Sequence, residues 1–344
     1  MMEKIKIFDA TLRDGSHALK HQFSKENIER FCRHIDKAGL DAVIVGHGNG
    51  LGASSLQVGI SKLPDREMLI TAKRYLKNTP LGVYMIPGFG TIRDDLEPAI
   101  DLGAEIFKIG CQCTEADTTK QHIEYLCRRG KKVYGILMMY HMTDTWRLLE
   151  EAQKMQGYGA KGVIIMDSAG ASTPELVKRT ISTLKGGLNI EVGFHAHNNL
   201  GLAVGNTYIA IQEGASIVDG TIRGFGAGAG NCPLEVLVAL LKKENYELNA
   251  IDWYAMLDAS EEVVKGFSPN DKGIDDISLV SGVAGVFSAF KVHVLRAAKE
   301  FNVDARDIFM ELGERKAMAG QEDMIVDVAA ELRNRKAMDE GFSF

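Results

Sequence analysis

The sequence has no excess of positive charge, and this absence excludes two classes of partner. Its 40 Lys and Arg residues are outnumbered by 46 Asp and Glu residues, which gives a net charge of −6 at pH 7. A chain with this charge balance has no general electrostatic attraction to nucleic acid or to an anionic membrane surface. We therefore expect neither nucleic acid nor a membrane as a partner.

Long apolar runs and a cysteine framework are also missing. No stretch of about 18 uncharged apolar residues occurs, so we expect no membrane span. The first six residues alternate charged and apolar side chains, unlike a secretory signal. An odd number of cysteines without a repeated pattern suits free thiols in a reducing compartment. We expect a cytoplasmic protein whose free thiols are Cys32, Cys111, Cys113, Cys127 and Cys232.

Short apolar segments recur along the first two thirds of the chain. Each ends in small or polar residues and is followed by a segment with helical character. They cover residues 5–8, 41–45, 81–86, 106–110, 133–139, 162–166, 191–194 and 217–222. Eight such segments alternating with helices predict an α/β fold, a TIM (β/α)8 barrel with a parallel sheet. The alternative is an open doubly wound sheet, whose site would lie where the strand order reverses.

The last third of the chain lies outside this repeat and is predicted to be a C-terminal all-helical extension. Its expected helices cover residues 233–243, 253–265, 278–301, 305–312 and 322–335, and its most loop-like stretch is 266–273. We divide the chain into a catalytic barrel at residues 1–230, a helical C-terminal domain at 231–338 and a frayed tail at 339–344.

Three residues near predicted strand ends have the chemistry of metal ligands. His195 and His197 are two residues apart on one strand, so both point to the same face. Asp14 follows the first strand, which comes close to the seventh when a barrel closes. Two imidazoles and one carboxylate leave coordination positions open for water and substrate, as a catalytic divalent ion requires. The alternative is a pair of histidines that form hydrogen bonds in a wet cleft.

Three further polar residues are candidates for substrate chemistry. Arg13 could direct its guanidinium at a carboxylate or enolate beside the metal, or form a salt bridge at the barrel rim. His17 has an ordinary pKa of ~6.5, which suits a general base, although a hydrogen bond within the loop would also explain it. Ser168 ends the sixth strand and could donate to a substrate carboxylate.

Two other patterns are weaker. Cys111 and Cys113 end a strand, but two cysteines without further partners are little evidence for zinc. The glycines between Gly224 and Gly230 could form a phosphate site after the eighth strand. They lack the setting of a dinucleotide fingerprint, so we favour close backbone packing at the barrel mouth as their role.

Four segments resemble one enzyme family. They are DATLRDGSHA at residues 9–18, HAHNN at 195–199, GAGAGN at 226–231 and GQEDMIVDVA at 320–329. Together they resemble the metal-dependent class II pyruvate aldolases, in the superfamily that includes hydroxymethylglutaryl-CoA lyase and isopropylmalate synthase. The likeness is strongest to the 4-hydroxy-2-oxovalerate aldolase family and extends over nearly the whole chain.

The resemblance implies a reaction and a cofactor. The reaction is the reversible retro-aldol cleavage of a 4-hydroxy-2-oxoacid, such as 4-hydroxy-2-oxopentanoate, to pyruvate and an aldehyde. The cofactor is Mn²⁺, or another divalent ion such as Mg²⁺ or Co²⁺, with Asp14, His195 and His197 as its ligands. In the lyase branch, the position of Asn231 supplies a further ligand.

The resemblance also implies residue roles. Arg13 and the metal would polarise the 2-keto oxygen and stabilise the pyruvate enolate, and His17 would take the proton of the C4 hydroxyl. The substrate would be held by Arg13, Asp14, Ser168 and His195.

Two positions near the substrate depart from the family pattern. The family has a tyrosine in the extension where this chain has Phe287, which cannot donate a hydrogen bond. Strand three ends in Tyr84-Met85-Ile86, where the family usually has smaller aliphatic residues. The hydroxyl of Tyr84 could partly replace the missing tyrosine hydroxyl. We count both residues as substrate-binding and expect a preferred aldehyde other than acetaldehyde.

The family also has a protein partner. Its members bind an acylating aldehyde dehydrogenase through the helical extension and act in aromatic hydrocarbon catabolism. The extension here suits such a partner, and we expect an oligomer.

Three other functions compete with this one. Acetyl-CoA-dependent Claisen condensation, as in isopropylmalate or homocitrate synthases, usually requires Glu and Gln where His17 and Ala18 stand. A hydroxymethylglutaryl-CoA lyase requires a cysteine inside the glycine loop, but Cys232 follows it. A non-catalytic partner subunit would not need the three metal ligands.

Overall fold

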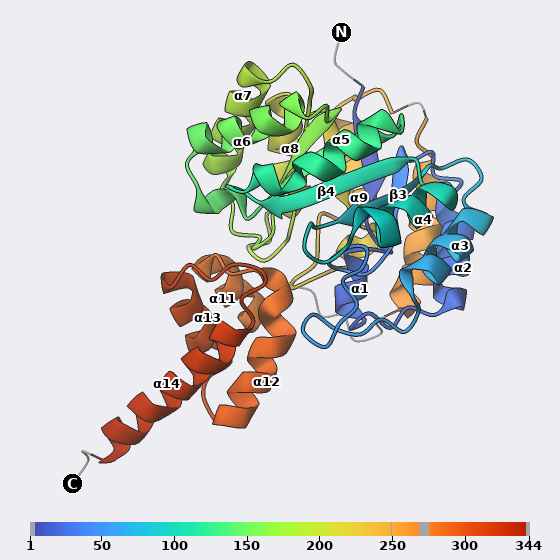
Figure 1. Ribbon diagram of the computed structural model, residues 1–344. Coiled ribbons are helices and arrows are strands. Elements are labelled where there is room, and N and C mark those ends of the chain that lie inside the picture. Colours follow the sequence, from blue (N-terminus) through green and yellow to red (C-terminus); the bar gives the residue numbers. More distant parts are fainter. Residues whose placement is uncertain (1–3, 249, 268–274, 342–344) are drawn as a thin grey trace.

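The structure is a computed structural model that describes residues 4–248, 250–267 and 275–341. Eight parallel strands form a closed barrel in sequence order (Figure 1). Because β1 pairs with both β2 and β8, the predicted TIM barrel is confirmed and the open sheet is excluded. The strands are β1 (Lys6–Asp9), β2 (Ala42–Ile44), β3 (Leu81–Met85), β4 (Ile106–Gln112), β5 (Lys132–Met138), β6 (Gly162–Asp167), β7 (Glu191–Ala196) and β8 (Ile217–Gly220).

Helices surround the barrel and bury apolar faces against it. In α2 (Lys25–Ile35), Ser24 and Asn27 form a capping box, and Ile28, Phe31 and Ile35 are buried at helical spacing. This pattern places one side of the helix against the strands. The other helices around the barrel are α3 (Asp65–Tyr75), α4 (Glu97–Asp101), α5 (Lys120–Arg128), α6 (Thr145–Gly157), α7 (Pro174–Gly187), α8 (Ala203–Gln212) and α9 (Leu234–Lys243).

The interior of the barrel is a second apolar core below the mouth. Phe8, Tyr84, Tyr134 and Ile164 belong to it, and the rings of Phe8 and Tyr134 make an edge contact at 5.3 Å. A filled interior means that reacting groups gather only at the mouth, where the strands end. No helix in the described part of the chain is long and apolar enough to cross a membrane.

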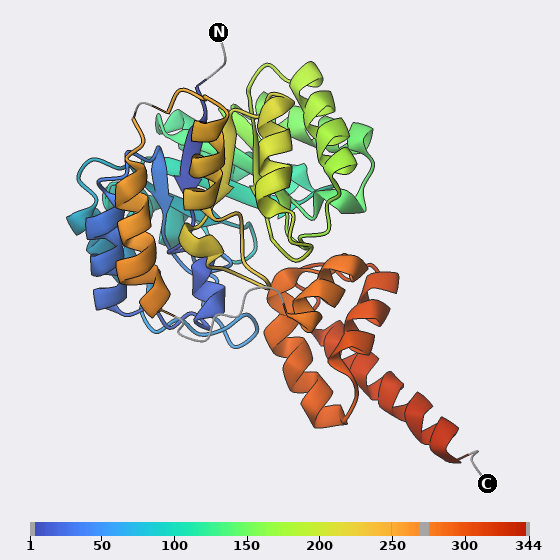
Figure 2. The same cartoon turned by 180° about the vertical axis from the view of Figure 1, so that it is seen from behind.

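The four C-terminal helices gather at one end of the barrel, and α14 points away from it (Figures 1 and 2). They have a hydrophobic core of their own, which includes Phe290, Val294, Phe309 and Val328. Polar contacts attach them to the barrel, because Asn199 Nδ2 donates to Ser278 O at 3.0 Å and Ser288 N donates to Ser168 O at 3.1 Å. The four are α11 (Asp276–Ala284), α12 (Lys291–Phe301), α13 (Ala305–Glu314) and α14 (Asp323–Gly341).

Two hydrophobic cores suggest where the chain divides. Side chains of α9 and α10 (Trp253–Asp258) belong to the core between the strands and the outer helices, which extends to Val264, whereas the buried residues of the C-terminal core begin at Val286. The division predicted at residue 230 stays a prediction, and it does not coincide with this gap. The predicted loop at 266–273 lies mostly outside the described residues. The frayed tail was predicted from residue 339, but α14 continues to Gly341, and residues 342–344 lie outside the description.

The helix predicted over residues 278–301 is wrong as a single element. It is broken into α11 and α12 by Gly285, which has a left-handed φ of 69° and ends α11. The side chains could not reveal the break, because apolar residues continue through it. Phe287 lies in this break, which brings it to the barrel mouth.

Candidate active site

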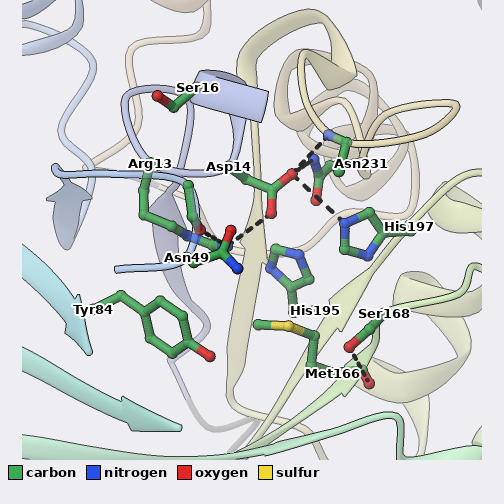
Figure 3. Close-up of polar contacts among 12 residues, drawn as sticks. Arg13, Asp14, Ser16, Asn49, Tyr84, Met166, Ser168, His195, His197 and Asn231 are labelled. Carbon is green, nitrogen blue, oxygen red and sulfur yellow. Dashed lines mark hydrogen bonds and ion pairs between the residues drawn. The ribbon is translucent and has the colours of Figure 1, made fainter. Parts of the chain in front are cut away.

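Three side chains with metal-ligating atoms converge at the barrel mouth. His195 lies in β7, His197 follows that strand, and Asp14 precedes the short helix α1 (Gly15–Ala18) (Figure 3). One ligand atom of each lies within 4.8 Å of the others, and all three residues are buried. Among the residues that the structure describes, no second group of this kind occurs. The predicted triad is therefore brought together.

The unpaired atoms of these residues fit a metal ion. Nε2 of both His195 and His197 is buried without a hydrogen-bond partner, and so is Oδ1 of Asn231. Buried polar atoms almost always have partners, so several unpaired ones at one point indicate a missing ligand. Two imidazoles and a carboxylate suit a divalent cation. The three residues therefore fit a divalent cation and could hold one.

Hydrogen bonds outside the site orient the ligands. His197 Nδ1 lies 2.9 Å from Asp167 O, so it carries the proton and leaves Nε2 free. Asp14 Oδ1 accepts from Asn231 Nδ2 at 2.7 Å and from Ala227 N at 3.0 Å. The other oxygen, Oδ2, accepts from Arg13 Nη1 at 2.7 Å. The carboxylate is thus held from two sides.

The charges around the triad set its protonation. Burial disfavours the ionised form of Asp14, but Arg13 and His197 outweigh it and hold the pKa of this carboxyl well below its usual value. Burial also acts against the charged form of His197, yet the Asp14 carboxylate raises the pKa of this imidazole. A carboxylate that stays ionised is the form that binds a cation.

His17 lies on α1 beside the triad. Burial lowers the pKa of its imidazole to about 4, so the ring is neutral near pH 7. Its ring packs closely against Gly48, where an added Cβ would lie only 2.6 Å from Nε2. A neutral imidazole can accept a proton, which a general base requires.

Glycine at position 226 allows the loop after β8 to approach the triad. A Cβ there would lie 1.9 Å from Asn231 Nδ2 and 2.5 Å from Asp14 Oδ1. No side chain fits in this space. The close backbone packing expected of these glycines is therefore found at Gly226.

A cavity of about 60 Å³ lies next to the triad. Its wall includes Arg13, Asp14, His17, Tyr84 and Phe287, together with His197. A larger cavity of about 540 Å³, between the mouth and the C-terminal helices, shares His17 and Phe287 with it. Six predicted site residues thus surround one small space.

Ser168 is less directly placed. Its Oγ accepts from Met139 N at 3.2 Å and is not part of the wall of either cavity. Tyr84 lies under the Arg13 guanidinium, 4.9 Å from the ring centre, and its hydroxyl donates to Met138 Sδ at 3.0 Å. The roles predicted for Ser168 and Tyr84 stay predictions.

Sequence reasoning missed several residues around the site. Lys108 and Asp219 form a fully buried ion pair, and Asp219 Oδ2 lies 3.2 Å from His195 Nδ1. Met138 and Met166 are in the wall of the smaller cavity. Each partner is a charged residue within an otherwise apolar strand, which signals that it needs a buried partner but does not identify that partner. Cys111 and Cys113 are buried free thiols and join no ligand group among the described residues.

Known proteins resemble this chain in two blocks and over its whole length. The HMGL-like family matches residues 4–263, and the DmpG-like communication domain matches residues 272–334. A 4-hydroxy-2-oxovalerate aldolase from Pectobacterium atrosepticum is 51% identical over 99% of this chain and 100% of its own. One from Spirochaeta aurantia is 50% identical over 96% of both.

A solved structure shares the fold only. The carboxyl transferase domain of Rhizobium etli pyruvate carboxylase matches with a TM-score of 0.78 and 14% identity, over 97% of this chain and 61% of that one. The sequence relatives share far more identity with this chain than this structure does. The chain belongs to the HMGL-like family and, within it, to the 4-hydroxy-2-oxovalerate aldolases.

Proposed function

We propose that this chain is a divalent-metal-dependent aldolase that cleaves a 4-hydroxy-2-oxoacid, such as 4-hydroxy-2-oxopentanoate, reversibly to pyruvate and an aldehyde. The observation that carries the proposal is the convergence of Asp14, His197, Arg13 and His17 on one small cavity beside His195. This set contains the metal ligands, a positively charged guanidinium and a general base, which the reaction requires. The relatives that bear the aldolase name support it.

Arg13 is suited to hold the developing enolate. Its Nε and Nη2 are buried without a hydrogen-bond partner, while Nη1 is bound to Asp14. The two free N–H groups can donate to the 2-keto oxygen and stabilise the negative charge that forms there. A divalent ion on the triad, for which we propose Mn²⁺ with Mg²⁺ and Co²⁺ as alternatives, would act as a Lewis acid on the same oxygen.

His17 is suited to start bond cleavage. The neutral imidazole accepts the proton of the C4 hydroxyl, the C4–O bond becomes a carbonyl and the C3–C4 bond breaks. The electron pair of that bond forms the enolate of pyruvate, which Arg13 neutralises. C3 of the enolate then gains one proton, which balances the proton that His17 accepted, so pyruvate is completed and the imidazole returns to its neutral form.

The carboxylate and the aldehyde part of the substrate would contact different sides of the active site. We assign the carboxylate to Ser168, whose Oγ would exchange its 3.5 Å contact with Met166 O for the substrate. The aldehyde side is bordered by Tyr84, Met138 and Phe287, which are mainly apolar. These side chains and the small cavity favour a short apolar aldehyde, and because Tyr84 and Phe287 differ from the family pattern we propose one other than acetaldehyde.

The C-terminal helices are the proposed contact for an acylating aldehyde dehydrogenase. The match to a communication domain supports a protein partner there. Exposed apolar side chains on these helices, such as Leu279, Val283, Val292 and Met310, are consistent with a contact surface. We further propose an oligomeric enzyme, in a cytoplasm that keeps all five cysteines as free thiols.

A substrate panel tests the proposed reaction. Purified protein with Mn²⁺ is given a series of 4-hydroxy-2-oxoacids, and pyruvate is followed with lactate dehydrogenase and NADH. We expect pyruvate release from at least one acid. Thiol release from acetyl-CoA and a 2-oxoacid, without pyruvate release, would identify a Claisen synthase instead. Silence in both assays would indicate a non-catalytic subunit.

A further inference from the structure

A buried ion pair crosses the inside of the barrel beneath the metal site. Lys108 lies in β4 and Asp219 in β8, which are opposite each other in the closed order of eight strands. Both side chains are completely buried, and their charged atoms are in direct contact. Lys108 therefore extends through the interior to reach its partner.

The surroundings of this pair make it costly to maintain. Tyr84 and Tyr134 flank Lys108 in the neighbouring strands, and the interior around the pair is an apolar core. Removing two charges from water is expensive, and apolar residues of similar size often serve stability as well or better. The stability of the barrel alone gives little reason for an ion pair here.

Asp219 also faces the metal site. Its Oδ2 lies 3.2 Å from Nδ1 of His195, to which it is a strand neighbour between β7 and β8. A carboxylate at Nδ1 selects the imidazole form with the proton on Nδ1 and directs the free Nε2 elsewhere. Both ring nitrogens of His195 are buried without a fully formed hydrogen bond, but only Nδ1 has a carboxylate beside it, so Nε2 is the nitrogen left for a ligand.

We propose that Lys108 and Asp219 are positioning residues: Lys108 holds the Asp219 carboxylate, and Asp219 fixes the tautomer and ring orientation of His195 for metal binding. This inference rests on the metal site of the proposed function, but it does not require the aldolase substrate. Neither residue touches the substrate cavity, so both act through His195.

Metal affinity tests the proposal without using activity. Metal-depleted full-length protein is titrated with Mn²⁺ by calorimetry and with Co²⁺ by visible absorption. We expect Asp219→Asn to weaken Mn²⁺ binding by about 10- to 100-fold and to change the Co²⁺ spectrum. Lys108→Met should also weaken Mn²⁺ binding. Lys108→Arg keeps the positive charge, so it should bind Mn²⁺ about as tightly as the wild type.

Two further variants separate positioning from folding. The double variant Lys108→Met with Asp219→Asn leaves no unpaired charge, so it should keep the unfolding temperature near that of the wild type and still bind Mn²⁺ weakly. Glu151→Gln, which alters a buried carboxylate of α6, is the matched control and should leave metal affinity unchanged.

The outcomes are distinct. Wild-type Mn²⁺ affinity and an unchanged Co²⁺ spectrum in Asp219→Asn would overturn the proposal, as would failure of the double variant to fold. If the wild type itself bound no metal ion, the proposed metal-dependent function would fail as well. If it bound metal but released no pyruvate, only the aldolase assignment would be lost.

Discussion

Single side chains at the barrel mouth combine tight anchoring with selected free atoms. Asp14 accepts three hydrogen bonds, and Arg13 uses one nitrogen to hold it while two others stay unpaired. Such preorganised donors stabilise a developing charge because they need not reorient during the reaction. Chemistry at this scale depends on which atoms are left without a partner.

Replacing His17 tests the general base. We expect His17→Asn to lower kcat for pyruvate release by about 10²- to 10⁴-fold, because the neutral imidazole that accepts the hydroxyl proton is lost. Metal affinity should be unchanged, since His17 is not in the ligand triad. Steady-state kinetics and calorimetric Mn²⁺ titration measure the two effects, and His122→Asn on the outer helix α5 is the control. A wild-type kcat in His17→Asn would exclude this role.

Replacing Phe287 tests the departure from the family pattern. Phe287 borders both cavities, and its ring contacts Phe290 at 5.7 Å. We expect Phe287→Tyr to change the rate or the stereochemical preference of cleavage, because a hydroxyl is added beside the C4 substituent. Kinetics with each enantiomer of the 4-hydroxy-2-oxoacid measure this. If the variant and the wild type have the same kinetics with each enantiomer, Phe287 serves only for packing.

Some of these residues could be predicted from the sequence and others could not. His195 and His197 could be predicted because side chains two residues apart in extended chain lie on the same face. Lys108 and Asp219 are 111 residues apart and meet only when opposite strands close around the interior. Nothing local in the sequence specifies that contact.

At the scale of elements, the breaks between regular segments shape the site. Gly285 ends α11 and places Phe287 at the mouth, and His141 Nε2 lies 3.1 Å from Gly285 O across the barrel–extension contact. The eight strands and their order were predictable, because each apolar segment is distinct in the sequence and is followed by a helical segment. The break was not, because it depends on one backbone angle within an apolar run.

The loop after β8 offers a test at this scale. We expect Gly226→Ala to weaken Mn²⁺ binding at least 10-fold, because the added Cβ would collide with Asn231 and Asp14 and displace the carboxylate. Gly205→Ala in α8 is the matched control, since no atom lies within 4 Å of its added Cβ and helix propensity favours alanine. Calorimetric titration of both variants measures the effect. Equal affinity in the two would mean that the loop adapts without disturbing the ligand.

At the scale of the whole molecule, the chain consists of the barrel, the C-terminal helices with their own core, and a polar mouth between them. The second cavity lies where the barrel and the C-terminal helices meet, so both parts contribute to its wall. The extension was predictable as helical, but its attachment was not, because Asn199 reaches Ser278 and Ser281 by contacts between distant segments.

Acid should destabilise the folded protein through buried imidazoles near the mouth. Burial lowers the pKa of His47 to about 4 and that of His21 to about 2, and their rings stack at 3.8 Å. The unfolded chain has ordinary imidazoles and binds more protons below about pH 6.5, so stability falls as the pH drops from there toward the folded values. Between pH 7 and 5, each of these two histidines lowers the free energy of unfolding by roughly 2 kcal/mol.

Urea unfolding of EDTA-treated protein measures this loss. We expect His21→Gln to lose about 2 kcal/mol less than the wild type between pH 7 and 5, because one imidazole that binds a proton only when unfolded is removed. The metal ligands titrate in both proteins and cancel in the comparison. An unchanged pH dependence in the variant would show that His21 does not contribute.

The most direct test of the central claim is a titration of metal-depleted protein with Mn²⁺ while pyruvate release from 4-hydroxy-2-oxopentanoate is followed. We expect no pyruvate release without metal, and restored activity that saturates at about one ion per chain, as a single site of Asp14, His195 and His197 requires. His195→Ala should not recover. Pyruvate release that persists at the full rate after complete metal removal would show that the reaction does not depend on a metal ion at this site.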